Sequence, residues 1–234
     1  MFFDPLYLVL ILATIVISGG AQMYIRSTYG RWAQVANSAG LTGAHVAEFL
    51  RSNARFGSRS GQEAITEIKV APGELSDHFD PRDRSLALSE AVATQPSVAA
   101  MAIAAHEVGH AQQVAEGSGL MKLRSVLVPA ASAGPGIAYL LIIAGIFLNM
   151  TGLLTLGIVL FGVAVLFSAL TLPVEIQASQ KAIAMLESTG VIRTSQDRQG
   201  AESMLRAAAF TYLAAAVASV LTLLSYIALS RRSN

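Results

Sequence analysis

The sequence predicts a mainly α-helical integral membrane protein with four membrane spans and a small antiparallel β-sheet. Of its 234 residues, 53% are hydrophobic and only 13% are charged, whereas an average soluble domain has about 25% charged residues. Four apolar runs are each long enough for a membrane-spanning helix, which needs about 20 residues. The formal net charge of +1 does not favour nucleic acid as a partner. The low share of charged residues instead indicates the lipid bilayer.

The first apolar run predicts a membrane anchor in residues 1–25. A cleaved signal peptide is the alternative interpretation. Such a peptide begins with basic residues and has an apolar stretch of about 7–15 residues. Here the run follows Asp4 and extends over residues 5–23 without a charge. We therefore expect an uncleaved anchor.

Residues 26–125 form the larger polar region. Within it, residues 29–55 favour a helix. Residues 64–71 and 85–89 alternate apolar and polar side chains, which predicts two strands. Between the strands, the Asp-Pro-Arg-Asp sequence at residues 80–83 is typical of a tight turn. We therefore expect the two strands to pair in an antiparallel arrangement.

The rest of the chain predicts three more spans and a second polar segment. Residues 126–172 favour a hairpin of two spans, with an uncharged turn at residues 149–152. Residues 173–206 are polar, and residues 207–234 contain the last span.

The basic residues predict the orientation in the cell membrane. Ten of the sixteen Lys and Arg residues lie in residues 26–125 and four lie in residues 173–206. Because basic loops stay in the cytoplasm, we expect a multi-pass protein with both polar regions in the cytoplasm and both termini outside. Arg231 and Arg232 disagree with this orientation, but they weigh less than the two polar regions.

The chemistry is indicated by the His-Glu-Val-Gly-His sequence at residues 106–110, in an Ala-rich segment that predicts a helix. Residues i and i+4 of a helix share one face, so His106 and His110 can bind one Zn²⁺ at about 2.0–2.1 Å. Glu107 can then act as a general base. The alternative is a helix with two structural or surface histidines. Gly109 argues against it, because Gly inside a helix costs about 1 kcal/mol relative to Ala and indicates the close approach of another segment or of substrate.

The third metal ligand is predicted to be a carboxylate. A catalytic zinc has three protein ligands and one position for water, and no third His lies near the motif. Glu175 is the first choice, because an acid so close to an apolar run is costly unless it is paired or bound to a metal. An ion pair of Glu175 with Lys181 is the alternative. Glu90 and Glu116 are the next candidate ligands.

Four pieces of the chain resemble the YugP-type membrane zinc metallopeptidases, in the order of that family. They are LSDHFDPR at residues 75–82, AAHEVGHA at 104–111, LPVEIQAS at 172–179 and AAAFTYLA at 207–214. The resemblance covers the chain from about residue 26 onward. It implies a neutral zinc peptidase embedded in the membrane, with a zincin-like core in residues 26–125.

The resemblance also implies the roles of the site residues. His106 and His110 are implied as zinc ligands and Glu107 as general base, while Glu175 matches the Glu of the downstream motif. Related zinc peptidases with a Glu ligand often have Asp at the position of Ser179, where it orients the first His. A hydroxyl can still form a hydrogen bond with an imidazole, but it lacks the charge of a carboxylate.

Two further residues are candidates for substrate or oxyanion contacts. His78 lies beside the predicted turn, and Tyr212 lies near the start of the last span. A well-placed donor to the oxyanion is worth about 3 kcal/mol. The alternatives are turn chemistry for His78 and a simple position at the membrane interface for Tyr212.

These patterns together predict an endopeptidase that hydrolyses peptides or membrane-proximal proteins with one Zn²⁺ per chain. The alternative is a non-enzymatic membrane protein in which zinc is structural or supports a scaffold. A closed structural site needs a fourth protein ligand, such as His78.

Overall fold

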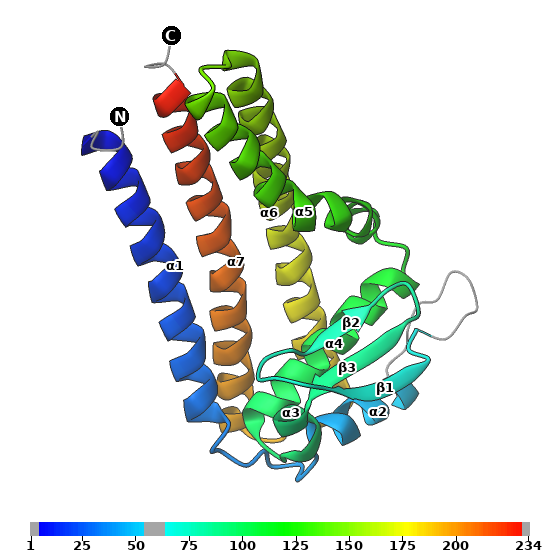
Figure 1. Ribbon diagram of the computed structural model, residues 1–234. Coiled ribbons are helices and arrows are strands. Elements are labelled where there is room, and N and C mark those ends of the chain that lie inside the picture. The colour runs from blue at the N-terminus through cyan, green and yellow to red at the C-terminus, as the bar shows by residue number, and fades with distance from the viewer. Residues whose placement is uncertain (1–4, 54–63, 231–234) are drawn as a thin grey trace. The chain divides into compact units, whose positions relative to one another are not determined.

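The computed structural model describes residues 5–53 and 64–230 and is mainly α-helical (Figure 1). The fold class predicted from the sequence is confirmed, because four long apolar helices accompany a small β-sheet. The chain divides into two compact units. The span unit comprises Met1–Gln22, Leu123–Pro173 and Phe210–Asn234, and the core unit comprises Met23–Lys122 and Val174–Ala209.

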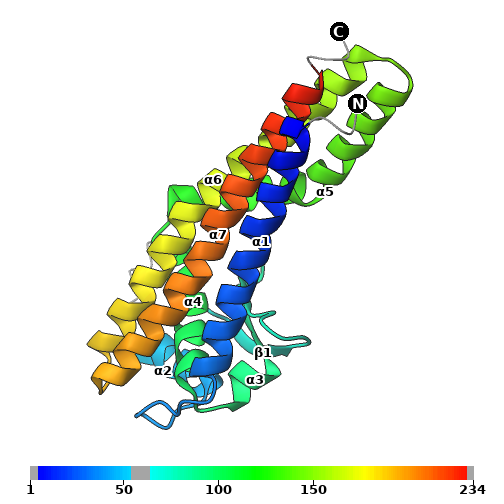
Figure 2. The same cartoon turned by 90° about the vertical axis from the view of Figure 1, so that its left-hand side faces the viewer.

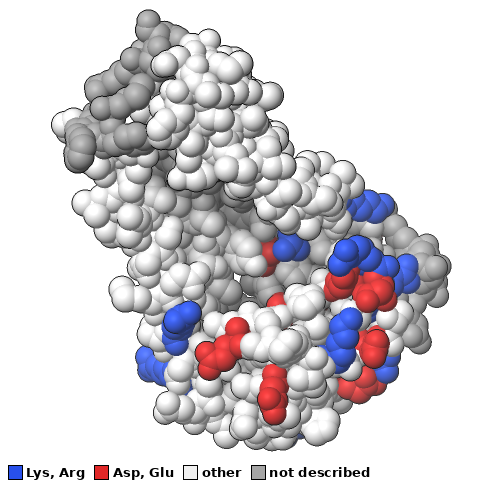
Figure 3. Space-filling model, viewed as in Figure 1, with Lys and Arg blue, Asp and Glu red and all other residues white. Residues whose placement is uncertain are grey.

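Among the described residues, four helices are long and apolar enough to cross a membrane: α1 (Pro5–Trp32), α5 (Gly119–Phe147), α6 (Thr151–Ser188) and α7 (Ser195–Ser230). They contain the four apolar runs of the sequence. Residues 126–172 have no Lys, Arg, Asp or Glu, and their visible surface is white in Figure 3. These helices support association of the protein with a membrane.

Two contacts show how helices pack within the span unit. A Cβ atom on Gly157 of α6 would lie 2.8 Å from Ala138 O of α5, so the two backbones approach closely at this glycine. Small residues permit such close packing between membrane helices. Phe161 of α6 packs edge-to-face against Tyr226 of α7, with ring centroids 5.2 Å apart.

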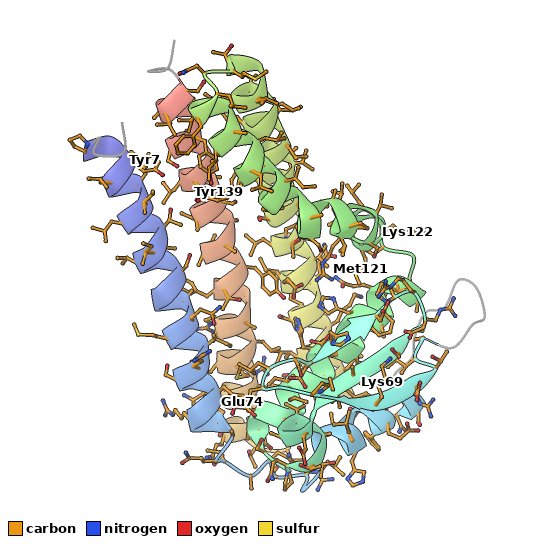
Figure 4. All side chains as sticks on the ribbon, in the orientation of Figure 1. Tyr7, Lys69, Glu74, Met121, Lys122 and Tyr139 are labelled. Atoms are coloured by element: carbon orange, nitrogen blue, oxygen red, sulfur yellow. The ribbon has the colours of Figure 1, made fainter. Side chains whose placement is uncertain are left out.

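The core unit contains a three-stranded mixed sheet with the order β1-β3-β2. Its strands are β1 (Glu67–Ala71), β2 (His78–Asp80) and β3 (Ser85–Ser89). β1 pairs parallel with β3, and β2 pairs antiparallel with β3. Charged side chains gather over this unit (Figure 3). Lys69 of β1, labelled in Figure 4, lies 3.6 Å from the Asp83 carboxylate.

The predicted antiparallel pairing of residues 64–71 with residues 85–89 is wrong. The strands in these segments run parallel, because the chain between them forms an additional strand, β2, on the other side of β3. The predicted turn at residues 80–83 is present, but it joins β2 to β3. β2 was not predicted from the sequence, because an element of three residues is too short to show an alternating pattern.

The helix predicted over residues 29–55 is interrupted by a loop. α1 ends at Trp32 and α2 spans Gly43–Asn53, while the last two predicted residues lie outside the described part of the chain. In the loop, the buried Asn37 side chain donates a hydrogen bond to Leu41 O (2.8 Å) and accepts one from Leu41 N (3.1 Å). Such side-chain bonds to the backbone compete with helix formation.

Helix α4 (Val98–Ala115) is the buried centre of the core unit. Ser97 begins it, because its Oγ accepts a hydrogen bond from Ala100 N (3.1 Å). Buried residues occur on every side of α4, as expected for a helix without a polar face. The helix packs against α2, α3 (Glu90–Thr94) and β2 (Figures 1 and 2). Polar side chains on α4 therefore enter the interior of the unit.

Candidate metal centre

Two histidines of α4 stand side by side in the core unit. His106 and His110 are 8% and 5% exposed. One helical turn separates them, and their ring centroids are 4.8 Å apart with the rings nearly perpendicular. The i, i+4 spacing thus places both imidazoles on one helix face, as predicted.

Glu175 of α6 completes a group of three possible metal ligands. Its Oε2 lies 3.0 Å from His106 Nε2 and 3.4 Å from His110 Nε2, and the residue is 1% exposed. Ligand atoms bound to one tetrahedral zinc lie about 3.4 Å apart, given metal–ligand distances near 2.1 Å. The donor types and their spacing therefore fit a metal ion, and in the described part of the chain this group has three members.

The other ring nitrogen of each histidine has its own hydrogen-bond partner. His106 Nδ1 lies 3.3 Å from Ser179 Oγ, and His110 Nδ1 lies 3.0 Å from Gln113 Oε1. The Ser179 hydroxyl thus contacts the first histidine at the position where related zinc peptidases often have Asp. Gln113 was not predicted from the sequence, although its position three residues after His110 places it on the same side of the helix.

Gly109 lies where α4 meets the backbone of α6. A Cβ atom at this position would have atoms of Ala178 as its nearest neighbours. Of the two reasons predicted for this glycine, the structure supports the close approach of another chain segment.

Glu107 is buried beside the group but is not one of its members. Burial raises the pKa of Glu107 to about 7, and the nearby Glu175 and Asp77 carboxylates act in the same direction. The backbone N–H of Phe79, in β2, acts in the opposite direction, because it favours the charged carboxylate. The result is a buried carboxyl group next to the candidate ligands.

The other candidate carboxylates lie outside the group. Glu116 accepts hydrogen bonds from Lys181 Nζ at 2.7 and 2.8 Å, so the alternative ion pair of Lys181 with Glu175 is not formed. Glu90 is exposed at the start of α3. Neither Glu90 nor Glu116 belongs to the candidate metal group.

His78 is exposed, and its Nδ1 lies 2.8 Å from Ser76 O. It does not belong to the candidate metal group. Its neighbour Asp77 accepts hydrogen bonds from Ser89 N (2.7 Å) and Ser89 Oγ (3.1 Å), and burial raises the pKa of Asp77. Tyr212 is half-buried on α7 in the span unit. Substrate contacts of His78 and Tyr212 stay predictions.

The candidate centre and the apolar helices define a membrane-associated protein of the zinc metallopeptidase class. The chain belongs to the family described as "Putative neutral zinc metallopeptidase", which matches residues 7–231. It is similar to the "Putative membrane protease YugP" of Bacillus subtilis (strain 168), with 37% identity over 224 residues and 95% of each chain covered. The predicted family is therefore confirmed. No solved structure matches the chain.

Proposed function

We propose that the protein is a membrane-embedded endopeptidase that uses one Zn²⁺ per chain. The convergence of His106 Nε2, His110 Nε2 and Glu175 Oε2 carries this proposal. Three protein donors leave one position for water, as in catalytic zinc sites, whereas structural sites have four protein ligands. Membership of a metallopeptidase family gives independent support.

The residues of the chain divide the catalytic work. His106, His110 and Glu175 hold the ion, which when bound would polarise the scissile carbonyl and lower the pKa of water toward about 7. Glu107 takes the proton of the attacking water and delivers it to the departing amine nitrogen.

The substrate is proposed to be an extended peptide segment near the membrane. β2 is an edge strand, and it packs against α4, the helix of Glu107. An edge strand can pair with an extended peptide through main-chain hydrogen bonds, whatever the peptide sequence. The four apolar helices favour substrates close to the bilayer, and the distribution of basic residues favours a cytoplasmic position of the site.

The non-enzymatic alternative has less support. A structural zinc site would need a fourth protein ligand, and the residue predicted for that role, His78, is exposed and contacts Ser76 O. No contact in the described part of the chain favours a scaffold role.

The test is a comparison of zinc content and hydrolysis in purified protein in detergent. Wild type should contain about one zinc per chain and hydrolyse an unstructured protein substrate. Glu107→Gln should keep its zinc and lose at least about 100-fold in rate, while His106→Ala should lose both. His45→Ala is the matched control, because His45 is an exposed histidine of α2. A Glu107→Gln protein with the wild-type rate would overturn the mechanism.

A further inference from the structure

Gln113 is a fully buried amide next to the candidate metal centre. It is 0% exposed and lies on α4, three residues after His110. Its Nε2 donates a hydrogen bond to Val174 O (2.9 Å), and its Oε1 lies 3.0 Å from His110 Nδ1. Buried polar groups require partners, and both ends of this side chain have one.

The contact with Val174 decides which way the amide points. A backbone carbonyl only accepts hydrogen bonds, so the NH₂ group of Gln113 must face it. The amide oxygen must then face His110, and an oxygen acceptor requires a proton on His110 Nδ1. In a neutral imidazole the other nitrogen carries the lone pair. His110 Nε2, which lies 3.4 Å from Glu175 Oε2, then carries the lone pair that a metal ligand needs.

Ser179 does not impose the same choice on the other histidine. Its hydroxyl lies 3.3 Å from His106 Nδ1, and a hydroxyl can donate or accept. Either tautomer of His106 is compatible with that contact. Of the two contacts to the Nδ1 atoms, the one from Gln113 thus defines a tautomer.

Gln113 also links the two helices that carry the ligands. Val174 directly precedes Glu175 on α6, so the hydrogen bond from Gln113 joins the helix of His110 to the backbone beside Glu175. The Gln113 side chain thereby orients His110 and holds the Glu175 segment of α6 next to it.

We infer that Gln113 is a positioning residue that holds His110 in the tautomer with a free Nε2 and anchors the Glu175 segment of α6 against α4. The inference rests on the proposed function, because it assigns a purpose to the same three ligands. Loss of such an outer hydrogen-bond partner typically weakens metal binding 10–100-fold.

Two substitutions separate the two contacts of Gln113. Gln113→Glu keeps an oxygen acceptor for His110 Nδ1 but replaces the amide donor to Val174 O. Gln113→Met has a similar length and loses both contacts. The difference in zinc affinity between the two variants therefore measures the contact with His110. Gln112→Met is the matched control, because Gln112 is the adjacent half-buried residue of α4.

The measurements are zinc affinity by competition with a chelator, the visible spectrum of the Co²⁺-loaded protein, and thermal unfolding of the metal-free protein. We expect Gln113→Met to bind zinc about 10–100-fold more weakly than wild type, with an altered Co²⁺ spectrum. Gln113→Glu should bind at least several-fold more tightly than Gln113→Met, and Gln112→Met should match wild type.

Equal loss of affinity in Gln113→Glu and Gln113→Met, or wild-type affinity in a folded Gln113→Met, would overturn the inference. The tautomer of His110 can also be measured directly, from ¹⁵N-histidine NMR spectra of the metal-free wild type. The chain has four histidines to assign. His110 should show a protonated Nδ1, and a protonated Nε2 with a bare Nδ1 would contradict the inference. If wild type binds zinc but hydrolyses nothing, the proposed function fails while these affinities still test Gln113.

Discussion

Gly109 of α4 faces the backbone of Ala178 on α6, and a Cβ atom at position 109 would lie 2.5 Å from Ala178 O. Real Cβ atoms do not approach a backbone oxygen so closely. The glycine therefore sets the distance between the helix that carries His106 and His110 and the helix that carries Glu175.

Gly109→Ala is expected to weaken metal binding and to lower the stability of the core unit. Alanine favours a helix over glycine by about 1 kcal/mol, but overpacking against a backbone that cannot rotate away typically costs about 1–3 kcal/mol. The shift of α6 should also reduce zinc affinity by about tenfold, or 1.4 kcal/mol. Thermal unfolding and chelator competition measure both effects.

Gly30→Ala is the control for this substitution. Gly30 lies inside α1, and nothing is within 4 Å of a Cβ atom at that position. Gly30→Ala should therefore leave the zinc affinity of the protein unchanged. If Gly109→Ala behaves like Gly30→Ala, then the contact between α4 and α6 tolerates an added methyl group and our account of Gly109 fails.

Carboxylate substitutions should distinguish the candidate ligand from its neighbours. Glu175→Gln keeps the size of the side chain and removes its charge, so most of the bound zinc should be lost. Glu116→Gln should keep its zinc and lose less than about 1 kcal/mol of stability, because its ion pair with Lys181 is partly exposed. The measurement is the zinc content of both variants and of wild type by elemental analysis. Loss of zinc in Glu116→Gln but not in Glu175→Gln would reverse the assignment.

Removal of the metal should lower the melting temperature of the wild-type protein. A ligand that binds only the folded state stabilises it by about 2.7 kcal/mol at a free concentration 100 times its Kd. Thermal unfolding with and without a chelator measures this difference. His106→Ala should show no such difference, since one of the three donors is gone. A melting temperature of wild type that does not respond to zinc would argue against a site that links α4 to α6.

The contact of Asp80 with Arg82 should make stability depend on pH in the acid range. The hydrogen bond from the Arg82 side chain lowers the pKa of Asp80 from 3.8 to about 2. Because the folded state holds the charged form, this stabilisation is complete above pH 3.8 and is lost as the pH falls toward 2. Arg82 is exposed, so solvent screening keeps the contribution small.

Asp80→Asn removes this pH dependence. Its melting temperature should lie slightly below that of wild type near neutral pH, and the two should converge as the pH approaches 2. The measurement is thermal unfolding of both proteins over that pH range. A gap that widens on acidification would show that the sign of the effect is wrong.

The four apolar helices and the placement of His106 beside His110 follow from local features of the sequence. Apolar runs of sufficient length predict membrane helices regardless of what surrounds them, and the i, i+4 spacing brings two side chains together through the geometry of a single helix. Both properties are local, so they can be predicted without knowledge of the fold. Glu175 was predicted from its position beside an apolar run, but its distance from the histidines depends on the packing of α6 against α4.

The sheet topology and the outer contacts of the site depend on how distant segments pack. The parallel pairing of β1 with β3 depends on where the intervening chain passes, and a strand as short as β2 has no readable pattern. Gln113 looks in the sequence like any polar residue of a helix. Its role arises because α6 covers it and presents Val174 O to one end of the amide while His110 occupies the other. Contacts between segments about sixty residues apart are set by packing, which no local spacing encodes.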